Sequence, residues 1–203
     1  MEESLVSALV NPARPVFLFG LTPPSIDTTE SKSLEICEKF VARGRTLAVD
    51  GFICYDVQDE TSRTDAPRPF RFRKLQDPSW YAGCITAASH KQCVVYKAAP
   101  ACESGPAFEK WLSECTERDG HTAINVVGAP SSAVSSTGPS TKEACELVDR
   151  RAGVKFGCVC IAERHMKSRK EHLNLANKAA WGAEWFITQV RVASVPPPNP
   201  LPS

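Results

Sequence analysis

The sequence lacks any apolar run close to the roughly 18 residues that a membrane-spanning helix needs. Its first residues include Glu2 and Glu3, where a secretory signal peptide would carry basic side chains. A charge excess is also missing, because 24 lysines and arginines offset 23 aspartates and glutamates. We therefore expect a cytoplasmic protein that binds neither membranes nor nucleic acid.

Paired cysteine motifs are missing as well. The 203 residues contain nine cysteines, an odd number, and most of them stand inside apolar stretches. Cys158 and Cys160 are close together, but no second pair follows at a spacing typical of zinc ligands. We expect buried free thiols, with neither a disulfide framework nor a metal site.

What the sequence does contain is a series of short apolar runs with helical patterns between them. No GxGxxG motif follows the first run, where a dinucleotide-binding fold would carry it. Nearly continuous apolar strands that alternate with amphipathic helices indicate a parallel sheet covered by helices. The six runs comprise residues 15–20, 49–56, 93–98, 122–128, 154–162 and 184–189.

Residues that start and end helices recur between these runs. Ser140 with Glu143, and Ser168 with Glu171, have the spacing of capping boxes, in which the first residue caps the helix. Gly182 stands where the last of these helices should end. The alternation of strands and helices therefore predicts a chain of βα units.

Two architectures accept this alternation, an open doubly wound sheet and a closed (β/α)8 barrel. The strand and helix periods favour the barrel, which in its complete form has eight units and typically about 250 residues. Six units can be recognised in this sequence. We predict an α/β fold of the (β/α)8 TIM-barrel type in which the last two units are missing.

Both ends of the sequence are expected to lie outside the barrel. We assign residues 1–14 to an N-terminal extension, 15–190 to the partial barrel and 191–203 to a proline-rich, disordered tail. Five of the 16 prolines fall in the last eight residues, so this tail cannot supply further βα units. We expect a truncated or mis-spliced product, with a genuine short form as the alternative.

Polar residues end several of the apolar runs, at the edge where parallel barrels carry their functional groups. Asp56 and Lys97 are examples, and loops are also polar without being functional. Glu171, Asn174 and Lys178 share one helical face. From spacing alone this face is more simply interpreted as solvent-exposed.

Two segments resemble the methylenetetrahydrofolate reductases, a family of flavin-containing (β/α)8 barrels. VCIAERH (159–165), followed by EHLNLANKAAWGAEWFITQ (171–189), resembles their strand five, helix five and strand six. FLFGLTPPSID (17–27) is similar to their first strand, which ends in a Pro-Pro pair. The similarity covers about residues 15–190 and is most specific over 157–189.

The resemblance implies sites for FAD and for a folate. Gln189 would hydrogen-bond the pterin ring, because a side-chain amide both donates and accepts hydrogen bonds. The FAD contacts would come from the turn after strand four, the turn after strand five and the following helix, namely Gly128, His165, Glu171, Asn174 and Lys178.

The sequence also departs from the family at two positions. Gly20 stands where the family usually has a proton-donating glutamate, and Ala129 stands where it has an aspartate near the flavin. Asp59 and Glu163 follow strands of the same barrel and could replace the missing acid if burial raises their pKa. They are our candidate catalytic residues.

The resemblance thus implies a flavin-dependent oxidoreductase of one-carbon metabolism, which reduces 5,10-methylenetetrahydrofolate to 5-methyltetrahydrofolate with FAD as cofactor and NAD(P)H as hydride donor. The alternative is a catalytically inactive, incomplete barrel that acts as a binding or regulatory partner of a full-length relative, since its outer strands would be unpaired edges. A homo-oligomer would also cover these edges. A third hypothesis is an unrelated barrel that acts on phosphorylated metabolites.

Overall fold

The computed structural model describes residues 3–11, 13–59, 72–129, 136–162, 165 and 170–188. In this part of the chain six strands form one parallel sheet, in which each strand pairs with the next along the sequence. The strands are β1 (Leu18–Leu21), β2 (Gly51–Cys54), β3 (Cys93–Ala98), β4 (Ala123–Val127), β5 (Lys155–Cys160) and β6 (Trp185–Thr188).

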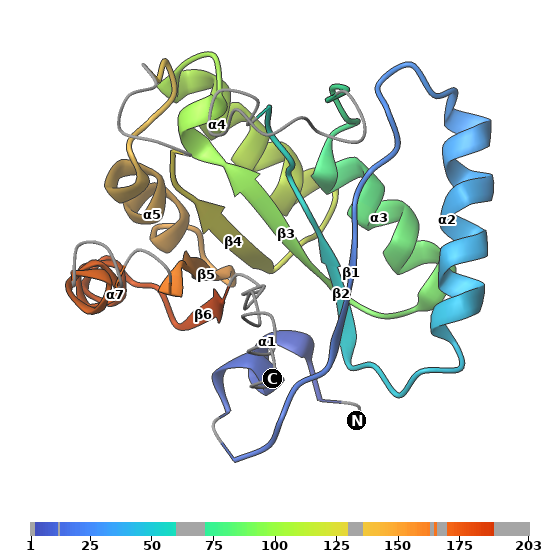
Figure 1. Ribbon diagram of the computed structural model, residues 1–203, viewed down its shortest axis with the longest axis horizontal. Helices are drawn as coiled ribbons and strands as arrows, with labels where there is room; N and C mark the ends of the chain where they lie inside the picture. Colours follow the sequence, from blue (N-terminus) through green and yellow to red (C-terminus); the bar gives the residue numbers. More distant parts are fainter. Residues whose placement is uncertain are drawn as a thin grey trace, which may run out of the picture.

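The sheet curls into half of a barrel, with helices along its outer side (Figure 1). Its order β1-β2-β3-β4-β5-β6 never reverses, as the order in a doubly wound sheet does. The predicted α/β class is therefore confirmed, and the architecture is that of an incomplete TIM-like barrel. The helices are α1 (Leu5–Val10), α2 (Glu30–Gly44), α3 (Pro78–Ser89), α4 (Gly105–Ser113), α5 (Thr141–Asp149) and α7 (Glu171–Ala180), with a 3₁₀ turn η2 (Ala99–Ala101) and a π turn η3 (Glu114–Arg118).

The helix ends follow local chemistry that the sequence partly predicts. The capping box of Ser140 and Glu143 is present at the start of α5. Gly182 has a φ of 100° just after α7, a backbone conformation that suits glycine. Ser168 of the second predicted box lies outside the described residues. Helix α7 begins at Glu171, after Lys170, which makes no side-chain cap. None of the described helices is long and apolar enough to cross a membrane.

The larger core lies between the sheet and the outer helices. Strand residues such as Phe52 and Ile124 pack there against helix residues such as Tyr81 and Leu112. The nine cysteines are free, and six of them are buried. Burial raises the pKa of Cys93 to about 12, so this thiol behaves as a small apolar side chain.

A second core cluster covers the inner, concave face of the sheet. It consists of Leu5, Ile53, Val94, Tyr96, Ala123 and Trp185. Leu5 comes from α1, which lies below the sheet at the end where β1 and β2 begin (Figure 1). The backbone N–H of Leu5 donates to Oε1 of Gln92 over 2.8 Å, just before β3. Helix α1 thus closes the amino end of the half-barrel.

Candidate functional site

The carboxyl ends of the parallel strands meet at the edge opposite α1, where barrels carry their sites. Asp56, just after β2, accepts a hydrogen bond from the backbone N–H of Ala98 over 2.8 Å. Its other oxygen accepts from Nε2 of Gln58 over 2.6 Å. Asp56 therefore ties the end of β3 to the loop that follows β2.

One of the two candidate catalytic carboxylates, Asp59, lies within the described residues. Asp59 is exposed after β2, and β3 and β4 separate that strand from β5. Glu163 lies outside the described residues, as does the predicted pterin contact Gln189. Their assigned roles stay predictions.

Part of the polar face of α7 points toward the sheet, because Glu171 and Lys178 reach the end of β5, whereas Asn174 is exposed. Glu171 is only 2% exposed, and its carboxylate accepts from the backbone N–H of Ile161 and from Nδ2 of Asn174, both over 3.0 Å. Lys178 donates from Nζ to the carbonyl oxygen of Val159 over 2.6 Å. Leu173 is 51% exposed instead. The structure therefore brings Glu171, Asn174 and Lys178 together around the end of β5.

His165 lies beside the same helix but makes a different contact. Its ring is edge-on to that of His172, with 5.4 Å between the ring centres, and its side chain is exposed. His172 belongs to the first turn of α7. The structure thus places His165 near the predicted FAD contacts of α7.

Gly128 has a packing reason to be glycine. A Cβ atom at this position would lie 2.8 Å from Oγ1 of Thr141, at the start of α5, which is too close. The close approach therefore positions the turn after β4 against α5. This role is compatible with the predicted flavin contact and does not depend on it.

Lys97 does not join the other polar residues of the carboxyl edge. Its ammonium group lies 4.7 Å from the centre of the Trp111 ring and 3.7 Å from the carboxylate of Asp77. Trp111 donates its indole N–H to the same carboxylate over 3.0 Å. Because these partners belong to the outer helical layer, the expected convergence of polar strand ends fails at β3.

The ring of Tyr55 lies beside Gly20, the position at which the family usually has a glutamate. A Cβ atom built on Gly20 would be 2.6 Å from Cε2 of Tyr55. Tyr55 also packs edge-on against Tyr96, with 4.9 Å between the ring centres. Burial raises the pKa of both tyrosines, so their hydroxyl groups stay protonated at neutral pH.

One polar residue of the inner face, Asn125, was not predicted from the sequence to be a site residue. It stands in the middle of β4, is fully buried, and is in register with Tyr96 on one side and Gly157 on the other. Gly157 is in turn in register with Trp185. The indication available in the sequence was a single amide inside the apolar run AINVV.

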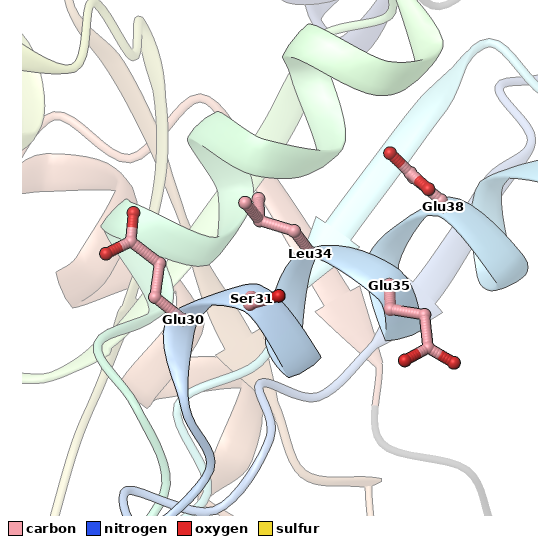
Figure 2. Close-up of a pocket in the computed structure, with 5 residues that line it drawn as sticks. All are labelled: Glu30, Ser31, Leu34, Glu35 and Glu38. Atoms are coloured by element: carbon pink, nitrogen blue, oxygen red, sulfur yellow. The ribbon is translucent and has the colours of Figure 1, made fainter.

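A surface hollow on α2 is not a candidate site. Figure 2 shows that its lining side chains all come from this one helix, namely Glu30, Ser31, Leu34, Glu35 and Glu38. Lys32 and Lys39 hold the pKa of Glu35 at about 2 through their hydrogen bonds to it. We interpret the hollow as the charged outer face of a solvent-exposed helix.

No protein-family model and no curated protein matches the chain. Among solved structures, the chain is similar to an uncharacterized protein from Clostridium thermocellum that binds two copies of 5-methyl-5,6,7,8-tetrahydrofolic acid. The identity is 25% and the TM-score 0.73, and the match covers 92% of this chain. It covers 58% of the other chain, so the present chain spans little more than half of that protein.

Two further structures share less with the chain. One is the 4-hydroxy-tetrahydrodipicolinate synthase of Methylacidiphilum fumariolicum SolV, at 11% identity and a TM-score of 0.46, covering 83% of this chain and 52% of that one. The other is PhdJ bound to a substrate intermediate, at 10% identity and a TM-score of 0.44, covering 85% and 59%.

Proposed function

We propose that the chain binds a reduced folate on the inner face of its half-barrel. The observation that carries this proposal is the similarity, at 25% identity over 92% of the chain, to a structure that binds 5-methyltetrahydrofolate. The resemblance to methylenetetrahydrofolate reductases also implies folate binding and so agrees with this proposal. The FAD binding that it implies has no support besides the resemblance.

The inner face has the chemistry that a pterin requires. A pterin is a flat heteroaromatic ring whose edge both donates and accepts hydrogen bonds, and ligand sites of this kind combine aromatic walls with a few polar groups. Tyr55, Tyr96 and Trp185 supply aromatic rings on this face, and Asn125 supplies an amide. Helix α1 closes the amino end, which leaves the carboxyl edge as the approach.

Calorimetric titration of the purified chain with 5-methyltetrahydrofolate tests the proposal. We expect saturable binding that Tyr96→Leu weakens by about tenfold, because an aromatic wall of the site is lost. Tyr81→Leu is the matched control, since Tyr81 is also buried but lies in the outer core, on the opposite side of the sheet. Absence of binding by the folded wild-type chain would rule the proposal out.

A flavin-dependent reductase is the second candidate function. It is favoured by the polar face of α7, because Lys178 bonds to the carbonyl oxygen of Val159 in β5 and Asn174 bonds to the neighbouring Glu171, in the region where the resemblance would place FAD. The ammonium group of Lys178 fits the diphosphate of FAD in charge. FAD, when bound, would supply hydride transfer from NAD(P)H. Gly20 offers no carboxylate for the accompanying proton transfer.

The visible absorption of the purified protein separates the candidates. A reductase retains a yellow flavin, loses it on Lys178→Met, and oxidises NAD(P)H when 5,10-methylenetetrahydrofolate is added. A folate-binding protein without flavin is colourless and still binds 5-methyltetrahydrofolate. The third outcome, a colourless chain that binds folate only when mixed with a full-length relative, would support the inactive-partner hypothesis.

A further inference from the structure

Asn125 has an unusual environment for a side-chain amide. It is 0% exposed, and neither its Nδ2 nor its Oδ1 has a hydrogen-bond partner. The indole Nε1 of Trp185 is also buried without a partner. Both residues belong to the row of inner-face positions that runs from Tyr96 through Asn125 and Gly157 to Trp185.

Gly157 allows these two polar groups to share one region. A Cβ atom at Gly157 would collide with the indole of Trp185, and its nearest contacts would be Cδ1 and Nε1. The nitrogen-bearing edge of the indole therefore lies over Gly157, on the strand that separates Trp185 from Asn125. A side chain at position 157 would push this edge away.

Buried polar groups without partners oppose folding, because each has lost its water and gained nothing in return. One such group, the hydroxyl of Tyr81, occurs by itself in the outer core. On the inner face two donors and an acceptor occur in one row of the sheet. This grouping indicates a partner that supplies several complementary groups at once.

We propose that Asn125 recognises the polar edge of the pterin ring and that Trp185 closes over it and donates its indole N–H to the same ring. The inference rests on the proposed folate binding. An amide side chain presents a donor and an acceptor side by side, which matches the 2-amino-4-oxo edge of a pterin. Tyr96, the in-register neighbour of Asn125 on β3, provides an aromatic wall.

The location of Trp185 explains how a covered site can open. Trp185 is the first residue of β6, which within the described residues pairs with β5 alone. Its indole lies over Gly157, so a rotation of this side chain would uncover Gly157, the in-register neighbour of Asn125. The binding site would thus lie deeper in the half-barrel than the strand ends where Glu171 and Lys178 gather.

The test uses Asn125→Leu, which keeps the size of the side chain and removes its polar atoms. We expect the affinity for 5-methyltetrahydrofolate to fall at least about tenfold, while the unliganded protein melts at the same or a higher temperature. Tyr81→Phe is the matched control. It removes the unpartnered hydroxyl of the outer core, and we expect it to leave the affinity unchanged.

A second ligand and a second variant complete the test. p-Aminobenzoylglutamate, the part of a folate without the pterin, should show no difference between wild type and Asn125→Leu. Trp185→Phe keeps an aromatic cover without the indole N–H and should weaken folate binding by a smaller factor. It also keeps the inference testable if Asn125→Leu does not fold.

The outcomes separate this inference from the function on which it rests. If the wild-type chain does not bind 5-methyltetrahydrofolate, the proposed function fails and this inference fails with it. If the wild type binds and both variants bind equally well, the inference alone is overturned.

Discussion

Gly20 and Tyr55 share a single side-chain space on the inner face of the sheet. With a Cβ atom on Gly20, the hydroxyl oxygen of Tyr55 would be 2.7 Å away, closer than atoms that are not bonded normally approach. Gly20 is also where the resemblance to methylenetetrahydrofolate reductases would place a glutamate. A glutamate at this position would therefore require the Tyr55 ring to move aside.

The first prediction concerns this pair. Gly20→Ala should lower the free energy of unfolding by about 1–3 kcal/mol, because it overpacks the contact with the Tyr55 ring. In a Tyr55→Leu background the same substitution should cost much less. A double-mutant cycle measured by urea denaturation checks the coupling, and strictly additive effects would contradict the shared space.

The second prediction concerns the buried carboxylate of α7. Glu171→Ala should destabilise the protein by about 1–3 kcal/mol, because it leaves the backbone N–H of Ile161 without its acceptor. Asn177→Ala, at an exposed position of the same helix, serves as the control. Equal melting temperatures for the two variants would show that Glu171 is not a structural residue.

The third prediction is a dependence of stability on pH. His121 is buried against the carbonyl oxygen of Ser79, and burial lowers its pKa below the ordinary 6.5, although the nearby Asp119 and Asp77 act in the opposite direction. Just below pH 6.5 the unfolded chain binds a proton that the folded chain does not, so the free energy of unfolding falls as the pH drops toward the folded pKa.

Thermal melts between neutral and mildly acidic pH check this prediction. His121→Gln should reduce the loss of stability over that window. The control is His90→Asn, at an exposed position whose left-handed backbone asparagine tolerates. If both variants lose stability as steeply as the wild type, other groups account for the pH dependence.

The fourth prediction concerns thiol chemistry. Alkylation of the native protein, followed by mass spectrometry, should label the half-buried Cys84, Cys102 and Cys160 before any of the six buried thiols. Burial raises the pKa of Cys37 to about 11, so little thiolate is available at neutral pH. Early labelling of Cys37 would indicate that α2 detaches from the core.

The alternation of apolar runs and helical patterns predicted the fold correctly. The run 93–98 coincides with β3, and 49–56 contains β2, because short apolar stretches between turns can hardly form anything else in a parallel sheet. Boundaries were less accurate. The first run was placed at 15–20, whereas β1 spans Leu18–Leu21, because the pairing with β2 begins at Leu18 and still includes Leu21 opposite Cys54.

The arrangement of the site residues was harder to predict from the sequence than the fold. Spacing shows that Glu171, Asn174 and Lys178 share a face, but the direction of that face depends on which backbone groups of β5 need partners. Lys97 was expected at the common edge and instead belongs to the outer layer, because side chains alternate along a strand. Asn125 was not predicted, because a single amide in an apolar strand does not by itself indicate a binding site.

Helix α1 blocks the amino end of the half-barrel, so the concave face of the sheet is not open at both ends. With Leu5 buried there and bonded to Gln92, a ligand cannot reach Asn125 through the amino end and approaches from the carboxyl side, where Asp56 and Glu171 lie, or from the open side of the sheet. A folate held there would lie with its ring down and its glutamate outward. The site would then bind the same pterin ring whatever the length of the glutamate chain attached to it.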